Sequence, residues 1–251
     1  YFPDEVNLGA ALGRVLRRPA VFEVSGGLGN YDRKGIEKAL KGRSGALSAE
    51  VLADVLERAG FPLPAEAQAA SFEEMKDACE RIGYPLAMKV LGPLHKSDIG
   101  GVRLMIADAG AAGRAWHDLT AIEGAEGVVI QRMVEGTEVI IGASRSGDLG
   151  HLVMFGLGGI YTEVLKDVAF ALAPLSGEEC RTMVTSIRSY PILEGVRGQK
   201  GVSLERLVDC LRRLGRLVSD FPRIEEIDLN PVKGSGDELY VVDARMILNT
   251  A

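Results

Sequence analysis

The sequence predicts an α+β protein built from two subdomains. Helical and strand patterns alternate along the 251 residues without the strict strand–helix–strand order of a parallel sheet. Three short strand patterns follow one another between residues 127 and 155, which indicates an antiparallel meander. The length and the hydrophobic content of 47% suffice for a large core, in one domain or in two closely packed halves.

Composition narrows the class of protein. A net charge of −6 and a pI near 5.3 argue against nucleic acid or an anionic membrane surface as the main partner, because both favour a basic face. No apolar run approaches the roughly 20 residues that cross a bilayer, and no signal-peptide pattern opens the sequence, so we expect a cytoplasmic enzyme. The cysteines, Cys79, Cys180 and Cys210, are spaced too widely for a disulfide framework or a metal cluster.

The first 46 residues predict a linker or an edge element, the tail of a preceding domain. Leu8, Leu12 and Leu16 indicate a short helix, and the glycine-rich segment 25–30 lacks the Gly-Lys-Ser/Thr of a phosphate loop. The sequence begins at Tyr1 without an initiator methionine, so we expect a piece of a longer protein. The main domain is expected over 47–251, divided into subdomains at about 47–125 and 126–251.

Capping signals place the first helices. One helix is expected from Ser48, an N-cap residue, to Gly60, a stop residue. A second begins with the capping box of Ser71 and Glu74 and ends at Gly83. Apolar periodicity then predicts a strand at 86–90, a strand at 102–107 and a helix at 109–119.

The second subdomain is predicted from the same signals. The expected elements are strands at 127–133, 138–144 and 151–155, helices at 176–190 and 203–218, and strands at 224–229 and 239–244. The helix at 203–218 carries a leucine stripe that should face a core. The final two strands are joined through Asn230-Pro231 and a Gly-Ser-Gly-Asp turn, so we expect them to pair.

A short segment after the first predicted strand has a composition suited to phosphate. It contains Lys89, His95, Lys96, Asp98, Gly100 and Gly101. Lysines neutralise phosphate oxygens, and paired glycines let backbone N–H groups approach an anion. A carboxylate such as Asp98 can keep one nitrogen of His95 protonated and leave the other free to accept a phosphoryl group. The alternative is an ordinary loop or core histidine.

An oxygen-rich face is predicted near the C-terminus. Strand alternation places Asp228 and Asn230 on one face, and Asp243 lies in a following strand that can pair alongside. Such a set of hard oxygen ligands suits Mg²⁺. The alternative is that these residues are strand-end caps or ion-pair partners of Arg245.

Five motifs in a fixed order carry a family resemblance. They occupy residues 89–102, 131–142, 154–167, 195–198 and 226–231. Over about 47–249 the sequence resembles the ATP-grasp domain of ADP-forming (NDP-forming) acyl-CoA synthetases, relatives of the succinyl-CoA synthetase beta chain. The resemblance implies an ATP-grasp fold, in which two α+β subdomains clamp a magnesium nucleotide.

The resemblance also implies roles for single residues. By this resemblance, Lys89 would bind the phosphates of ATP or ADP, and Gln131, Met133 and Val134 would line the adenine pocket. The other residues implied in nucleotide binding are Gly100, Gly101, Glu138, Gly158, Gly159 and Lys166. Mg²⁺ falls to Asp228, Asn230 and Asp243. His95, with Lys96 and Asp98, occupies the position of a phosphate-carrying histidine.

The expected function is the nucleotide half of a reversible reaction: acyl-CoA, ADP and phosphate give acid, CoA and ATP. The CoA-binding and ligase domains are expected in the same longer chain or in a partner subunit. Two alternatives stay open. One is a regulatory ligand-binding module, as in acetyltransferase fusions. The other is a carboxylate–amine ligase, which does not need His95.

Overall fold

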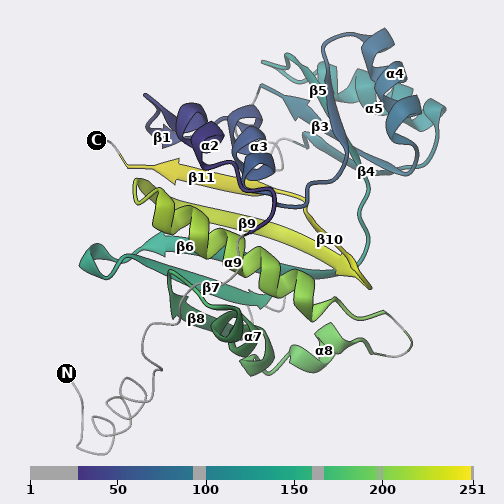
Figure 1. Cartoon of the computed structure of the whole chain (residues 1–251). Coiled ribbons are helices and arrows are strands. Elements are labelled where there is room, and N and C mark those ends of the chain that lie inside the picture. The colour runs from purple at the N-terminus through teal and green to yellow at the C-terminus, as the bar shows by residue number, and fades with distance from the viewer. Residues whose placement is uncertain (1–27, 93–99, 160–166, 197, 199, 250–251) are drawn as a thin grey trace, which may run out of the picture.

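The computed structural model describes residues 28–92, 100–159, 167–196, 198 and 200–249, and two antiparallel sheets organise them (Figure 1). The larger sheet has seven strands in the order β1-β11-β9-β6-β7-β8, with β10 beside β9. The smaller sheet has four strands in the order β2-β5-β3-β4. The predicted α+β class is therefore confirmed.

The smaller unit follows the sequence closely. Its elements are β2 (Glu66–Ala69), α4 (Phe72–Ile82), β3 (Leu86–Leu91), β4 (Val102–Ile106), α5 (Ala109–Thr120) and β5 (Gly127–Arg132). α4 and α5 pack on one face of the sheet, where Met75, Leu86 and Trp116 are buried. Strand β2 was not predicted, because Glu-Ala-Gln-Ala has little strand propensity and depends on pairing with β5.

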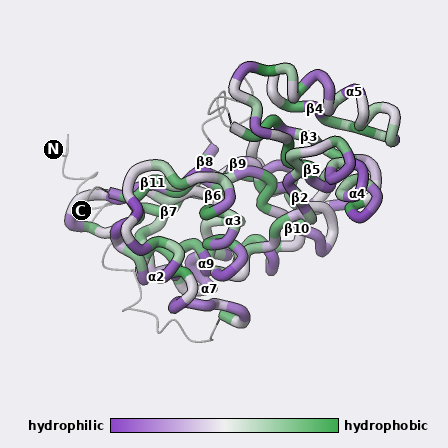
Figure 2. The backbone as a smooth tube through the Cα atoms, turned by 90° about the horizontal axis from the view of Figure 1, so that it is seen from above, coloured by the Kyte–Doolittle hydropathy of each residue, from purple (hydrophilic) through white to green (hydrophobic). Residues whose placement is uncertain are grey.

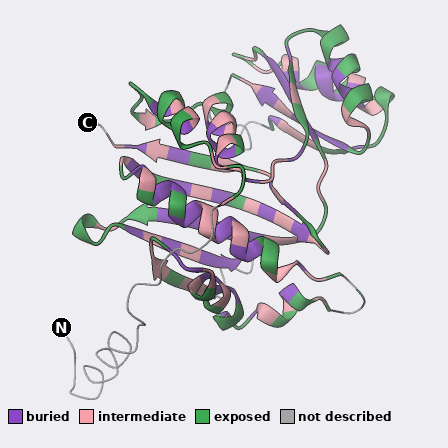
Figure 3. Ribbon diagram, in the orientation of Figure 1, coloured by how far each residue is buried: buried purple, intermediate pink, exposed green. Residues whose placement is uncertain are grey.

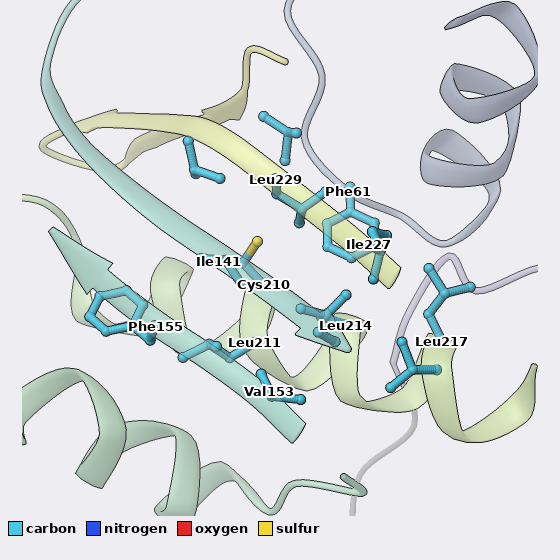
Figure 4. Packing of buried hydrophobic residues seen from close by; sticks show 14 of the residues in the cluster. Phe61, Ile141, Val153, Phe155, Cys210, Leu211, Leu214, Leu217, Ile227 and Leu229 are labelled. Atoms are coloured by element: carbon cyan, nitrogen blue, oxygen red, sulfur yellow. The ribbon is translucent and has the colours of Figure 1, made fainter. Parts of the chain in front are cut away.

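The larger unit is built around one long helix. Its elements are α2 (Arg33–Leu40), β1 (Gly45–Ala46), α3 (Ala49–Arg58), β6 (Thr137–Arg145), the 3-10 turn η1 (Gly147–Leu149), β7 (His151–Leu157), β8 (Val168–Leu172), α7 (Gly177–Ser186), α8 (Tyr190–Glu194), α9 (Leu204–Asp220), β9 (Ile224–Ser235), β10 (Glu238–Val241) and β11 (Ala244–Leu248). α9 runs across one face of the sheet (Figure 1), and Leu211 and Leu214 lie in the same core cluster as Ile141 and Phe155 (Figure 4). The predicted leucine stripe is confirmed.

Residues before Ser48 are structured where they are described. Asp32 caps α2 by accepting a hydrogen bond from the Gly35 amide at 2.9 Å, and β1 pairs with β11 at the sheet edge. The helix expected around Leu8 to Leu16 lies outside the described residues. The expected boundaries near 47 and 126 do not coincide with the division between the sheets, because α3 packs with the larger unit and β5 with the smaller one.

Three predicted elements have different limits in the structure. The helix expected at 176–190 is two helices, because Pro191 lacks the N–H that a continuous helix needs. β9 continues past Pro231 to Ser235 and forms a hairpin with β10. The strand expected at 239–244 divides into β10 and β11 at Val242 and Asp243, which leave the ladder.

Burial follows the alternation of the strands. In β9 the side chains of Ile227 and Leu229 are buried, whereas Asp228 is half-buried and Asn230 exposed, so the two faces separate as predicted (Figure 3). The hydropathy of the elements agrees with this burial. Most residues of the buried strand β3 are apolar, whereas α4, which packs on the outside of the smaller sheet, carries many polar residues (Figure 2). Within the described ranges, none of the helices has the length and apolar character needed to cross a membrane.

Candidate functional site

The two sheets meet at a contact between charged or polar side chains of the smaller sheet and one carbonyl of the larger unit. Lys89 Nζ lies 3.4 Å from the Val242 carbonyl oxygen, and Gln131 Nε2 lies 3.3 Å from the same atom. A small cavity of about 100 Å³ lies beside this contact, and we call it the intersheet cavity; its lining includes Glu66, Lys89, Gln131, Val242 and Asp243. Lys89 and Asp243, which are far apart in the sequence, therefore line one cavity.

Gln131 is fixed by its surroundings. The side chain is 4% exposed on β5, and its Nε2 atom donates to Glu66 Oε2 at 3.1 Å as well as to Val242. Glu66 is the cross-strand partner of Gln131 in the β2–β5 ladder, which explains why the two side chains meet. Because the amide nitrogen of Gln131 donates to two fixed acceptors, the buried side chain holds one orientation.

Of the three residues predicted to bind metal, only Asp243 lines the intersheet cavity. Asp228 and Asn230 lie on β9, and Asp243 lies in the break between β10 and β11. The Asn230 amide donates to the Asp243 carbonyl at 3.0 Å, so the break is tied to β9. One Asp243 carboxylate oxygen accepts the Ala244 amide at 2.9 Å, and Arg245 stands opposite Asp228 in the β9–β11 ladder.

The electrostatics of this group favour a cation. Burial raises the pKa of the Asp228 carboxyl above its ordinary value; a hydrogen bond with Asn230 opposes the shift, and the carboxylates of Glu226 and Asp243 add to it. Mg²⁺ needs only one or two carboxylates when water and substrate phosphates supply the other oxygens. Among the described residues no three His, Cys, Asp or Glu side chains form a metal cluster, so Asn230 and a bound phosphate would have to complete the site. The donor set fits Mg²⁺ on that condition.

The predicted adenine residues Met133 and Val134 follow β5 in the segment that joins the two units. They line a hollow of about 510 Å³, together with Tyr84, Arg132 and Tyr240. The Met133 amide donates to the Pro85 carbonyl at 3.1 Å, which holds this segment against the start of β3. The segment is separate from the intersheet cavity, although Gln131 lies next to both.

Glu138, Gly158 and Gly159 share a third cavity, of about 630 Å³, with Val196 and Lys200. The Gly158 amide donates to the Glu138 carbonyl at 2.7 Å, so this N–H already has a partner within the protein. The Glu138 carboxylate pairs with Lys233 Nζ at 2.9 Å.

The sequence analysis missed Glu66 and Lys200, which line these cavities, and Lys233, which pairs with Glu138. Lys233 interrupts an otherwise apolar stretch of β9, which was the available signal for its role. Glu66 and Lys200 have no distinguishing pattern in the sequence around them.

The remaining predicted residues belong to the β3–β4 hairpin and to two segments that the structure does not describe. The Gly101 carbonyl accepts the Val90 amide at 2.8 Å, and Gly100 has a φ of +68°, so both glycines shape the base of the hairpin. His95, Lys96, Asp98 and Lys166 lie outside the described residues.

Comparison with known proteins identifies the family of this chain. The sequence matches the model of the ATP-grasp domain family over residues 38–248. It is 41% identical to the beta subunit of acetate–CoA ligase (ADP-forming) I of Pyrococcus furiosus, covering 86% of this chain and 97% of that one. It is 40% identical to acetate–CoA ligase (ADP-forming) I of Archaeoglobus fulgidus, covering 85% of this chain and 32% of that longer one.

Solved structures of similar proteins have the same fold. The acetyl-coenzyme A synthetase 1 of Candidatus Korarchaeum cryptofilum, solved with coenzyme A and Ca-AMPCP, superimposes with a TM-score of 0.78 at 34% identity, covering 86% of this chain and 99% of that one. The same protein with coenzyme A and Mg-AMPPCP gives 0.74, also at 34% identity and with the same coverage of both chains. The chain therefore belongs to the ATP-grasp domain family, and it is similar to the beta subunits of ADP-forming acetate–CoA ligases.

Proposed function

We propose that this chain is the nucleotide-binding and phosphoryl-transfer part of an ADP-forming acyl-CoA synthetase. The observation that carries the proposal is the convergence of Lys89 and Asp243 on the intersheet cavity, where a cationic and an anionic group stand across one space. A magnesium nucleotide needs that combination, because its phosphates attract the ammonium and its metal attracts the carboxylate. The named ligase relatives support the same reaction class.

Each side chain would have a simple task. Lys89 would neutralise the phosphate oxygens of ADP or ATP, and Asp228, Asn230 and Asp243 would hold Mg²⁺. Bound Mg²⁺ supplies charge neutralisation during phosphoryl transfer. Entry of a nucleotide requires the Lys89 side chain to leave Val242 and the cavity to widen, because ligand pockets usually measure about 300–1,000 Å³, whereas the intersheet cavity measures about 100 Å³.

His95 would carry the phosphoryl group. In the direction of ATP synthesis, a terminal oxygen of ADP attacks the phosphorus bound to the His95 nitrogen. The new O–P bond forms as the N–P bond breaks, and the electron pair returns to the imidazole. Asp98 would hold the other ring nitrogen protonated. A neighbouring structure, named for a phosphohistidine segment that points towards the nucleotide-binding site, supports phosphohistidine chemistry in this group of proteins.

The acyl and CoA sites would lie outside these 251 residues. The Pyrococcus furiosus relative is named as a beta subunit, and the Archaeoglobus fulgidus relative is about three times the matched length. We therefore expect CoA-binding and ligase domains in a partner subunit or in the same longer chain. Neither a regulatory module nor a carboxylate–amine ligase is favoured by the named relatives, which are CoA ligases or synthetases.

One experiment tests the proposal. The chain is incubated with Mg-ATP, and acid-labile phosphate is mapped by mass spectrometry in the wild type, in His95→Ala and in the control His117→Ala, on the exposed face of α5. We expect phosphohistidine at position 95 in the wild type and in the control, and none in His95→Ala. Nucleotide binding without any phosphohistidine would favour a regulatory module, and phosphate at another residue would contradict the role of His95.

A further inference from the structure

The backbone of Val242 makes hydrogen bonds to both sheets. Its amide donates to the Pro231 carbonyl at 3.0 Å, while the next residue, Asp243, accepts the Asn230 amide through its own carbonyl. β9 thus holds the break between β10 and β11 from one side. The carbonyl of Val242 turns away from this ladder and accepts hydrogen bonds from the smaller sheet.

Two side chains of the smaller sheet share that carbonyl, and they differ in what a bound nucleotide would do to them. Lys89 is half-buried and is expected to turn to phosphate oxygens, which attract an ammonium more strongly than a neutral carbonyl does. Gln131 is neutral, buried and hydrogen-bonded to Glu66, so we expect its side chain to stay in place when phosphates bind. With nucleotide bound, Gln131 would be the remaining donor of this pair to Val242.

We infer that Gln131 is a positioning residue: through the Val242 carbonyl it holds the neighbouring Asp243 carboxylate where Mg²⁺ needs it. The inference rests on the proposed function. It gives Gln131 a different task from the one that the family resemblance implies, which is to line the adenine pocket.

Binding of Mg²⁺ would depend closely on the position of the Asp243 carboxylate. Mg²⁺ demands near-octahedral geometry with oxygen distances of about 2.0–2.1 Å, so a small tilt of a ligand weakens binding. Asp243 sits in a two-residue break rather than inside a ladder, and its backbone therefore depends on the bonds at Val242 and Asn230. Nucleotide bound without metal makes no such demand on Asp243.

The test separates metal positioning from adenine contact. Binding of ADP to the full 251-residue chain is measured by calorimetry, once with Mg²⁺ and once with EDTA. We expect Gln131→Glu to weaken binding of Mg-ADP about five- to ten-fold, the equivalent of one lost hydrogen bond to a positioned carbonyl. Binding of metal-free ADP should stay about the same.

A double variant isolates the bond to Val242. Glu66→Gln with Gln131→Glu re-forms a hydrogen bond between positions 66 and 131 with donor and acceptor exchanged, but position 131 can no longer donate to Val242. We expect this variant to stay as weak towards Mg-ADP as the single one. The matched control is Gln68→Glu, which adds the same charge to the lining of the intersheet cavity and leaves the bond from Gln131 to Val242 in place; it should keep the wild-type ratio of the two affinities.

Several results would overturn the inference. An equal loss with and without Mg²⁺ would indicate an adenine contact, and recovery in the double variant would show that only the bond to Glu66 matters. If Gln131→Glu does not fold, Gln131→Met removes the donors without adding charge, and the same comparison applies. If the wild-type chain binds no ADP at all, the proposed function fails first, and the role of Gln131 is not the cause.

Discussion

Lys89 Nζ and the Val242 carbonyl oxygen meet at 3.4 Å across the two sheets, although 153 positions separate the residues in the sequence. This contact brings the basic strand β3 to the residue next to Asp243. The fold thus places the phosphate-binding candidate beside a metal-binding candidate. Only a small rearrangement of the Lys89 side chain is needed for it to exchange a carbonyl for a phosphate oxygen.

Replacing Lys89 with glutamine should weaken nucleotide binding with little change in stability. We expect the affinity for Mg-ADP to fall about ten-fold or more, because a charge-assisted bond to phosphate is lost. The melting temperature should stay close to that of the wild type, since the bond to Val242 is long and half-exposed. Calorimetric titration and thermal melting measure the two effects. Lys34→Gln, on the exposed face of α2, is the control, and an equal loss there would contradict a specific role for Lys89.

Replacing Asp228 with asparagine should stabilise the protein without metal and remove part of its response to Mg²⁺. The raised pKa of Asp228, caused first by burial, means that the ionised form opposes folding at neutral pH. We expect the free energy of unfolding without metal to rise. Thermal melting in EDTA and in Mg-ADP measures both effects.

The control for Asp228 lies on the same strand. Glu226→Gln removes a neighbouring charge from an exposed side chain that is not a predicted ligand, so the variant should respond to Mg-ADP as the wild type does. An undiminished response in Asp228→Asn would show that this carboxylate does not take part in metal binding.

Replacing Gly158 with alanine should disturb the cavity at Glu138. An added Cβ would lie 2.8 Å from the Glu138 Cβ and 2.9 Å from its carbonyl carbon, so backbone must shift. Overpacking of this kind costs about 1–3 kcal/mol of stability. Urea denaturation measures the loss. Gly29→Ala is the control, because an added Cβ there meets no atom within 4 Å; an equal loss in both variants would contradict the steric argument.

The cysteines should react only when the protein unfolds. Burial raises the pKa of Cys180 and of Cys210 to about 12, and it also raises the pKa of Cys79. At pH 8 the thiolate fraction of Cys180 and Cys210 is then about one in ten thousand, and raising the pH to 9 leaves it below about 1%. We expect slow alkylation by iodoacetamide at both pH values and rapid alkylation of all three thiols in urea. Fast labelling of the folded chain would contradict their burial.

The sequence was sufficient wherever local signals fixed a structure. Ser71 caps α4 as predicted, because a hydroxyl followed three residues later by a glutamate satisfies backbone N–H groups without help from the rest of the chain. The leucine stripe of α9 and the alternation around Asp228 were predicted for the same reason. Pairing of the two C-terminal strands followed from a turn between them.

Contacts between distant residues were decided by the tertiary structure. The meeting of Gln131 with Glu66 and Val242 depends on the register of β2 against β5 and on the packing of the two units, and neither leaves a mark in the local sequence. The break at Val242 also depends on distant residues. Residues 239–244 predict a continuous strand, but Val242 leaves the ladder, and its carbonyl accepts hydrogen bonds from β3 and β5.

By itself, then, the sequence determined the α+β class, most of the elements, the candidate residues for nucleotide and metal, and the family resemblance. Each of these depends on residue type and short-range spacing. The tertiary structure decided that Lys89 and Asp243 face one cavity, that the Gly158 amide is already paired with Glu138, and that Gln131 bridges the two sheets. The physical reason is that such contacts arise from the packing of two separate cores, whose relative placement no local pattern encodes.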